Sequence, residues 1–328
     1  MLNIVVFFSK SDQKLDELYK KLESQQDAYP HQITSINIDE EKDVYQAYLG
    51  KTPVVEVGPY HLYSPFTDAD LKMTLGAAKD RQARLVETED PSYQKRIERG
   101  REVTGADRAS LWLTRNYMWI FNLGLLIFVG LPFLAPVFEK MGWTLPGKVI
   151  YTVYSPLCHQ LAFRSWFLYG EQTAYPRELA GVPGLSYEKA TGIDPHDVIA
   201  SRGFIGNSTL GYKVAICERD VAIYAGMLFF GILFTVTGRK LKSIPWYVWV
   251  VLGMVPMGID GFSQLPGLLD GLLSWLPIRE STPLLRTITG LLFGITTAWY
   301  GFPYIEDSMV QSRKTLLTKF AVTKVNHD

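Results

Sequence analysis

Residues 117–138 have the sequence YMWIFNLGLLIFVGLPFLAPVF, and this run decides the class of the protein. It contains no Asp, Glu, Lys or Arg, and its length is close to the roughly 20 residues that a helix needs to cross a bilayer. Further apolar runs lie at about residues 221–238, 246–265 and 284–304. We therefore expect residues 117–304 to form an all-α transmembrane bundle of about four spans.

The first 116 residues differ from this pattern, because they are rich in charged side chains. Lys and Arg balance Asp and Glu over the whole chain, giving a formal net charge of zero, so nothing in the charge indicates a nucleic-acid partner. Residues 1–9 are too short for the apolar core of a signal peptide and are followed by charged residues. We expect this N-terminal part to stay in the cytoplasm.

Residues 1–78 predict a small α/β domain. Strands are expected at residues 2–8, 33–38, 52–57 and 61–63, with helices after Ser11, at 43–49 and at 67–78. This order resembles the thioredoxin/glutaredoxin fold over the whole of residues 1–78. The resemblance implies a cis Thr52–Pro53 bond.

The chemistry of that fold depends on a Cys-x-x-Cys pair after the first strand. Here Ser9-Lys10-Ser11-Asp12 occupy the place, so thiol–disulfide exchange is excluded for this domain. We expect a docking or stability module that could receive a protein partner.

Basic residues indicate the orientation of the membrane part. The charged connector 79–116 is basic next to the first span, where it favours contact with anionic lipids. Three cations lie in the short loop 239–242, and the tail 305–328 carries four more. The positive-inside rule then places both termini in the cytoplasm, for a multi-pass protein of the cell membrane.

Residues 149–164 are apolar enough to enter the bilayer, but a full span here would invert everything after it. We expect a re-entrant or interfacial segment at the outer face, buried against protein. Residues 169–213, rich in Gly, Pro and charge, then form an outer loop or cap.

This topology gathers polar residues at the outer side. Asp260 and Gln264 share a helix face, and an ionisable group in a membrane helix usually pairs within the bundle. Arg219 or Arg286 is the expected partner of Asp260. The complete predicted pocket is Cys158, His159, Gln160, Arg164, Ser165, Cys217, Arg219, Asp220, Tyr224, Asp260, Gln264 and Arg286.

The chain has two cysteines, and three interpretations of them remain open. The first is a zinc-like metal site of Cys158, His159, Cys217 and either Asp220 or Asp260. The second is a Cys158–Cys217 disulfide at the oxidising outer face. The third is a pair of buried free thiols. The other histidines are expected at the surface, namely His31, His61, His196 and His327.

Several short motifs occur in one order along residues 148–300. They are Cys158-His159-Gln160, Arg164-Ser165, Cys217-Glu218-Arg219-Asp220, Tyr224-Ala225-Gly226, Asp260-Gly261-Phe262-Ser263-Gln264 and Arg286-Thr287-Ile288-Thr289-Gly290. In this order they resemble the membrane protein family catalogued as domain of unknown function 2085, and that resemblance implies no reaction. Where the family pattern also allows a second cysteine, this chain has Asp220, which removes one thiolate from the metal interpretation.

Together these features predict a membrane protein with a Cys/His/Arg/Asp pocket that binds an anionic lipid headgroup or a metal. Turnover of a lipid-linked substrate is one version, with His159 or Asp260 as the base. The alternative is a non-catalytic subunit of a larger membrane complex, with the N-terminal domain as its docking module. The spacing Gly290-x-x-x-Gly294 indicates close helix packing within the chain.

Overall fold

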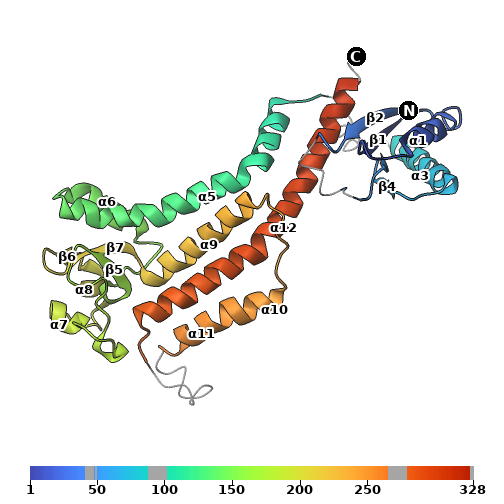
Figure 1. Ribbon diagram of the computed structural model, residues 1–328. Helices are drawn as coiled ribbons and strands as arrows, with labels where there is room; N and C mark the ends of the chain where they lie inside the picture. Colours follow the sequence, from blue (N-terminus) through green and yellow to red (C-terminus); the bar gives the residue numbers. More distant parts are fainter. Residues whose placement is uncertain (41–47, 49, 88–101, 265–278, 326–328) are drawn as a thin grey trace. The chain divides into compact units, whose positions relative to one another are not determined.

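A computed structural model describes residues 1–40, 48, 50–87, 102–264 and 279–325 (Figure 1). The chain forms two compact units. Unit 1 comprises residues 1–117 together with 307–328, and unit 2 comprises residues 118–306.

Unit 1 contains a four-stranded sheet of order β2-β1-β3-β4. Its strands are β1 (Leu2–Phe8), β2 (His31–Asn37), β3 (Val54–Val57) and β4 (Tyr60–Tyr63). β1 and β2 are parallel, whereas β3 is antiparallel to both β1 and β4. The strands lie where the sequence predicts them, and the Thr52–Pro53 bond is cis as expected. The helix predicted at 43–49 lies almost wholly outside the described residues.

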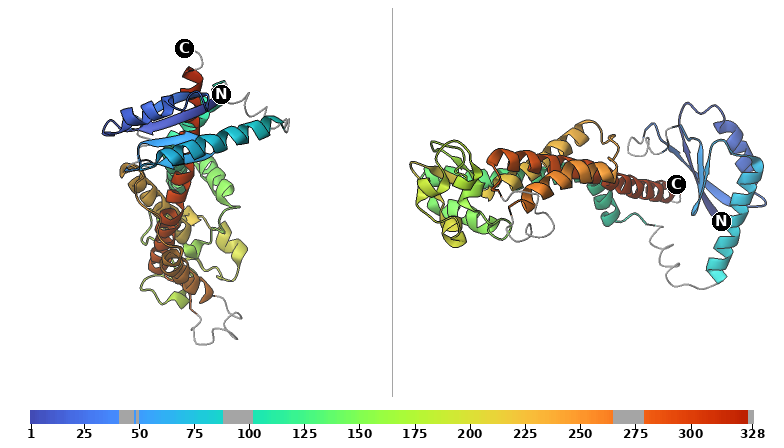
Figure 2. Two further views of the ribbon diagram at one scale, coloured as in Figure 1. Left: turned by 90° about the vertical axis from the view of Figure 1, so that its right-hand side faces the viewer. Right: turned by 90° about the horizontal axis from the view of Figure 1, so that it is seen from below.

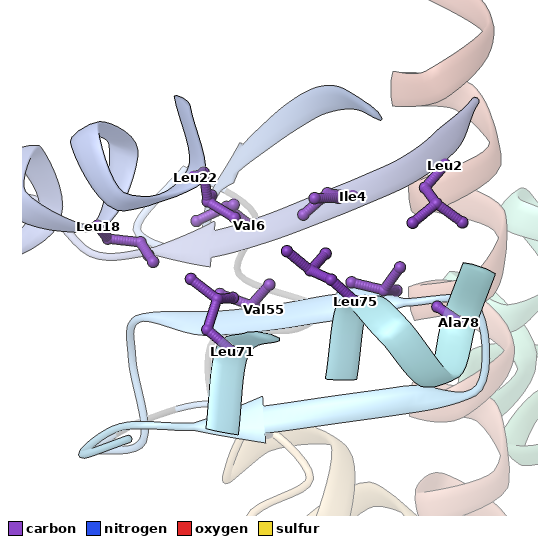
Figure 3. Packing of buried hydrophobic residues seen from close by; sticks show 10 residues of the cluster. Leu2, Ile4, Val6, Leu18, Leu22, Val55, Leu71, Leu75 and Ala78 are labelled. Carbon is purple, nitrogen blue, oxygen red and sulfur yellow. The ribbon is translucent and has the colours of Figure 1, made fainter. Parts of the chain in front are cut away.

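Helices α1 (Leu15–Glu23) and α3 (Asp68–Glu87) cover one face of this sheet (Figure 2). Their leucines are spaced three or four residues apart, which puts them on one side of each helix. Figure 3 shows these side chains directed at the strands. The cluster includes Leu2, Ile4, Val6, Leu18, Leu22, Val55, Leu71, Leu75 and Ala78. Because α3 continues to Glu87, the predicted helix end at residue 78 is too early.

The other face of the sheet is covered by the parts of α5 (Gly105–Lys140) and α12 (Pro283–Val325) that belong to unit 1. Leu111 and Leu317 pack with Val5 and Phe7 of β1. The structure here differs from the predicted connector 79–116 and tail 305–328, since both contribute helix and core to unit 1. The physical reason is that β1 has apolar side chains on both faces, and each face needs a cover.

Unit 2 contains the apolar helices. α9 spans Glu218–Val236, and a continuous helical segment comprises α10 (Trp246–Trp249), a π-helical stretch (Val250–Met254) and α11 (Val255–Phe262). Among the described residues, α5 and α9 are long and apolar enough to cross a membrane, and the apolar segment Trp246–Phe262 is shorter. Only 28% of the most apolar window of each long helix is buried, unlike the core helix of a soluble protein. Four spans remain a prediction.

Glycines let α9 and α12 approach closely. A Cβ on Gly294 would lie 2.0 Å from the carbonyl oxygen of Ile223, and one on Gly290 would lie 2.8 Å from that of Arg219. In the other direction, a Cβ on Gly226 would lie 2.9 Å from the carbonyl oxygen of Leu291. The predicted role of Gly290 and Gly294 in packing within the chain is confirmed.

Unit 2 also contains a small sheet, within and beside the predicted outer loop or cap 169–213, so this unit as a whole is mixed α/β and not all-α. β5 (Ser165–Leu168), β7 (Gly211–Cys217) and β6 (Gly206–Asn207) form an antiparallel sheet in that order. A 3-10 turn at Ala162–Arg164 precedes β5, and the connection from β5 to β6 contains a 3-10 turn at Glu178–Ala180, α7 (Tyr187–Thr191) and α8 (Val198–Gly203). This region has its own aromatic core, which includes Phe163, Phe167, Tyr175 and Tyr187.

The segment 149–164 is not one continuous helix. α6 spans Thr144–Tyr154, and its 11 residues reach about 16 Å, far less than the roughly 30 Å of a bilayer core. The chain then turns and reaches β5 through the 3-10 turn.

Candidate functional site

A cavity of about 380 Å³ in unit 2 brings most of the predicted pocket together. Ser165, Tyr224 and Asp260 are the predicted residues that do not line it. The lining residues are Leu157, Cys158, His159, Gln160, Leu161, Arg164, Cys217, Arg219, Asp220, Gln264 and Arg286. They come from the turn after α6, from the start of α9, from the end of α11 and from the start of α12.

Buried polar groups fix the turn that carries Cys158 and His159. Gln160 has a positive φ of 53°, and its Nε2 donates to the carbonyl oxygens of Tyr151 and Ala215, both at 2.8 Å. Lys213 on β7 donates from Nζ to the carbonyl oxygen of Gln160 at 2.7 Å. Lys213 is fully buried, and this burial lowers its pKa to about 7. The turn is therefore held in a conformation that a non-glycine residue seldom adopts.

The two cysteines lie side by side as free thiols, so the disulfide stays a prediction. Cys158 Sγ accepts hydrogen bonds from the backbone N–H of Cys217 at 3.3 Å and of Gln160 at 3.4 Å. The hydrogen bond with Cys217 lowers the pKa of the Cys158 thiol, and the same bond together with burial raises the pKa of the Cys217 thiol. The ligand atoms of Cys158, Cys217 and Asp220 all lie within 4.8 Å of one another. His159 lines the cavity but is outside this group of three.

Asp260 of α11 lies behind the cavity and is 1% exposed. Its Oδ2 accepts from Arg219 and, at 2.8 Å, from the Ser281 hydroxyl, while its Oδ1 accepts from Arg279 at 3.1 Å. Of the two partners predicted for Asp260, Arg219 is the one found, whereas Arg286 pairs with Glu218 and Glu280. Both carboxylate oxygens already have partners, so Asp260 links α11 to α9 and to the segment that leads into α12.

A second carboxylate, Glu280, joins three arginines. It accepts from Arg164 at 3.1 Å, from Arg177 at 3.3 Å and from Arg286. Arg286 also pairs with Glu218 at 3.5 Å. Sequence reasoning missed Glu218 and Glu280 as site residues. The available signal was their place beside Arg219 and Arg279, at the edges of apolar runs.

Among the described residues, this cluster carries more positive than negative charge. Five guanidinium groups (Arg164, Arg177, Arg219, Arg279 and Arg286) accompany four carboxylates (Glu218, Asp220, Asp260 and Glu280). The described cavity wall has three arginines and one carboxylate. Nε of Arg164 and of Arg219 is buried without a hydrogen-bond partner in the part of the chain that the structure describes.

The remaining predicted residues have structural surroundings. Ser165 is fully buried, and its hydroxyl donates to the carbonyl oxygen of Leu161 at 3.0 Å. Tyr224 packs edge-on against Phe128 with ring centroids 4.5 Å apart. Among the histidines, His61 and His196 are exposed as expected, but His31 is only 4% exposed, and His327 lies outside the described residues.

Comparison with known proteins bears on the same part of the chain. Residues 201–300 match the family described as "Predicted membrane protein (DUF2085)". This match confirms the family resemblance, and it includes Cys217, Asp260 and Arg286 but not Cys158. An uncharacterized protein of Methanocaldococcus jannaschii is 29% identical over 207 residues, which cover 61% of this chain and 99% of that protein. No solved structure matches. The description of DUF2085 agrees with the two long apolar helices and assigns no activity.

Proposed function

We propose that this chain is a multi-pass membrane protein whose outer-side cavity binds an anionic headgroup carrying phosphate. The observation that carries the proposal is a cavity wall with three arginines against one carboxylate. Guanidinium groups match phosphate oxygens in geometry as well as in charge. The volume of about 380 Å³ falls within the range of small-ligand sites.

Arg164 and Arg219 are the main candidate ligand contacts. Each has a buried Nε–H without an acceptor among the described residues, and burying an unpaired donor costs free energy that a bound acceptor would recover. Arg286 is 2% exposed and pairs with both Glu218 and Glu280, so its charge is largely compensated. A phosphate oxygen near Arg164 and Arg219 would satisfy the two free donors.

For an enzymatic version, His159 is the better base candidate. It lines the cavity, whereas Asp260 lies behind the wall with both oxygens engaged. A general base must reach the proton that it removes, and the position of His159 allows this. The substrate would then be a lipid-linked phosphate compound.

The topology proposed here has four spans, a re-entrant or interfacial segment at 149–164 and both termini in the cytoplasm. The exposed apolar windows of α5 and α9 and the basic loop 239–242 support it. A reporter fused to the C-terminus that is active only in the cytoplasm tests the orientation, and an inactive reporter on a well-expressed protein would reject it.

We also propose that the domain of residues 1–78 is thioredoxin-like without redox chemistry. The order β2-β1-β3-β4, with one parallel pair and a cis proline before β3, supports this. In place of a cysteine pair, Ser9 donates its hydroxyl to Asp39, and Asp12 accepts from the Ser9 backbone N–H at 2.8 Å.

The test of headgroup binding uses the purified full chain in mild detergent. Native mass spectrometry measures retention of phosphatidylglycerol against phosphatidylcholine, with inorganic phosphate as a competitor. Arg164→Gln should lower retention of the anionic lipid at least about tenfold. Arg177→Gln is the matched control, because Arg177 pairs with the same Glu280 but does not line the cavity.

The competitor separates two sources of the same chemistry. If inorganic phosphate displaces the lipid, the phosphate group itself is recognised. If it does not, the lipid chains contribute to binding. Equal retention of both lipids by the wild type and both variants would refute the proposal.

A further inference from the structure

We propose that Cys158, Cys217 and Asp220 form a binding site for a thiophilic divalent cation, with zinc as the best match. The chemistry of these ligands differs from headgroup binding by the arginines, so the proposal stands apart from the function proposed above. It is carried by three ligand atoms that converge from two distant parts of the chain.

The convergence fits the size of a metal site. The two sulfur atoms and a carboxylate oxygen of Asp220 all lie within 4.8 Å of one another. In a tetrahedral zinc site with bonds of about 2.0–2.3 Å, neighbouring ligand atoms are roughly 3.3–3.8 Å apart. Small side-chain rotations therefore suffice to bring the three atoms onto one ion. Two thiolates and a carboxylate suit zinc better than magnesium or calcium, which prefer oxygen ligands.

The surroundings of Cys158 suit a thiolate. Its sulfur accepts backbone N–H bonds from Gln160 and Cys217, and such bonds stabilise negative charge on sulfur. Cys217 is the N-cap of α9, and Asp220 lies in the first turn of this 19-residue helix. The positive end of the helix dipole therefore favours the anionic form of both ligands.

Hydrogen bonds fix the turn that carries Cys158. Gln160 is fixed by Tyr151 and Ala215, and Lys213 donates from Nζ to the carbonyl oxygens of Gln160 and, at 2.6 Å, of Arg202. These bonds hold Cys158 against the end of β7, whose last residue is Cys217. Hydrogen bonds around the ligand residues of this kind orient the metal ligands and raise the affinity for the metal.

Three protein ligands leave a fourth position open to the cavity. Zinc sites of the catalytic type have three protein ligands and a water or substrate, whereas structural sites have four protein ligands. His159 also lines this cavity and is the obvious competitor for the fourth position. On binding, the ion replaces two thiol protons, which go to solvent, and no electron is transferred.

The experiment uses the full chain, reduced with a phosphine that does not bind the metal, and freed of metal by dialysis. Titration with Co²⁺ should give one saturable equivalent with thiolate-to-metal charge-transfer absorption, and Zn²⁺ should bleach it. Cys158→Ser and Cys217→Ser should each abolish the charge-transfer band or weaken affinity at least about tenfold, and Asp220→Asn should weaken it. Glu171→Gln, an exposed carboxylate in the same unit, is the control and should bind as the wild type does.

A second measurement does not depend on variants that fold. Zinc X-ray absorption on the wild-type protein should report two sulfur ligands with the remaining ligands oxygen or nitrogen. His159→Ala then decides the fourth ligand, because loss of one nitrogen would identify the imidazole. Absence of saturable Co²⁺ binding, a shell without sulfur, or a Cys158–Cys217 disulfide in protein alkylated at lysis would overturn the proposal. None of these results depends on lipid, so they are independent of the headgroup test.

Discussion

Gly294→Ala is the sharpest test of how α9 and α12 pack. The added Cβ would lie 2.0 Å from the carbonyl oxygen of Ile223, and 3.0 Å from its Cα. Non-bonded heavy atoms come to rest at about 3.5 Å, so the helices must separate locally by about 1.5 Å. The atom in the way belongs to the backbone and cannot rotate aside.

The cost can be worked out against a matched control. Overpacking in a well-packed interface costs roughly 1–3 kcal/mol, and a backbone clash belongs at the upper end. Alanine also stabilises a helix by about 1 kcal/mol relative to glycine, and this gain offsets part of the overpacking cost. Gly130→Ala on α5 has the same gain in helix stability, and its Cβ would meet no atom of the described residues within 4 Å. The free energies of unfolding of the two variants should therefore differ by about 3 kcal/mol, and this difference measures the cost of the clash.

The assay is thermal unfolding in detergent, followed by tryptophan fluorescence. We expect an apparent midpoint for Gly294→Ala roughly 6–12 °C below that of Gly130→Ala. Maleimide labelling of Cys158, which is 7% exposed, should also become faster, because separation of the helices moves Arg219 at the cavity wall. Equal midpoints and equal labelling rates in the two variants would refute the packing argument.

Three further predictions concern buried groups. Asp260→Asn removes the charge that Arg219 and Arg279 share, and should lower the free energy of unfolding by about 3 kcal/mol in urea denaturation; an unchanged midpoint would show that the pairs contribute nothing. Leu317→Ala should destabilise unit 1 by about 2–4 kcal/mol in hydrogen-exchange measurements, whereas Met73→Ala, 70% exposed, should have little effect. Lys213 has a pKa of about 7 when folded and 10.5 when unfolded, so the unfolded state binds more protons between these values and stability should rise with pH from 7 to 10.5. The free energy of unfolding, taken from melting curves across this range, should rise by up to about 1.4 kcal/mol per pH unit in the wild type, and Lys213→Met should remove this rise. The same pH dependence in both proteins would show that other groups cause it.

Much of the site could be predicted from the sequence because ionisable residues are costly in apolar surroundings. Asp260 stands in an apolar run, and this alone implied a basic partner, which the structure gives as Arg219. Glu280 stands beside Arg279 at the edge of an apolar run, which marks it as a candidate site residue but does not identify its partners. Only the tertiary structure brings Arg164, Arg177 and Arg286 to its two oxygens.

The small sheet of unit 2 is a second feature that could not be predicted from the sequence. β7 is buried at most positions, so its sequence lacks the alternation that marks a half-exposed strand. Its partner β5 has only four residues and follows a 3-10 turn. Pairing between strands more than 40 residues apart is decided by which surfaces meet, and local pattern holds no information about that.

The sequence by itself determined the class of the protein, because a charge-free run such as residues 117–138 has few stable solutions other than a helix in an apolar environment. It also indicated most of the polar residues that line the cavity, since their polar chemistry differs from that of their apolar neighbours. Only the tertiary structure decided that α12 continues to Val325 and covers the second face of the four-stranded sheet of unit 1 through Leu317. Only the tertiary structure, too, brought Cys158 next to Cys217 and Asp220. The physical reason is that burial and ion pairing depend on surfaces far apart in the chain, whereas hydropathy and charge are local.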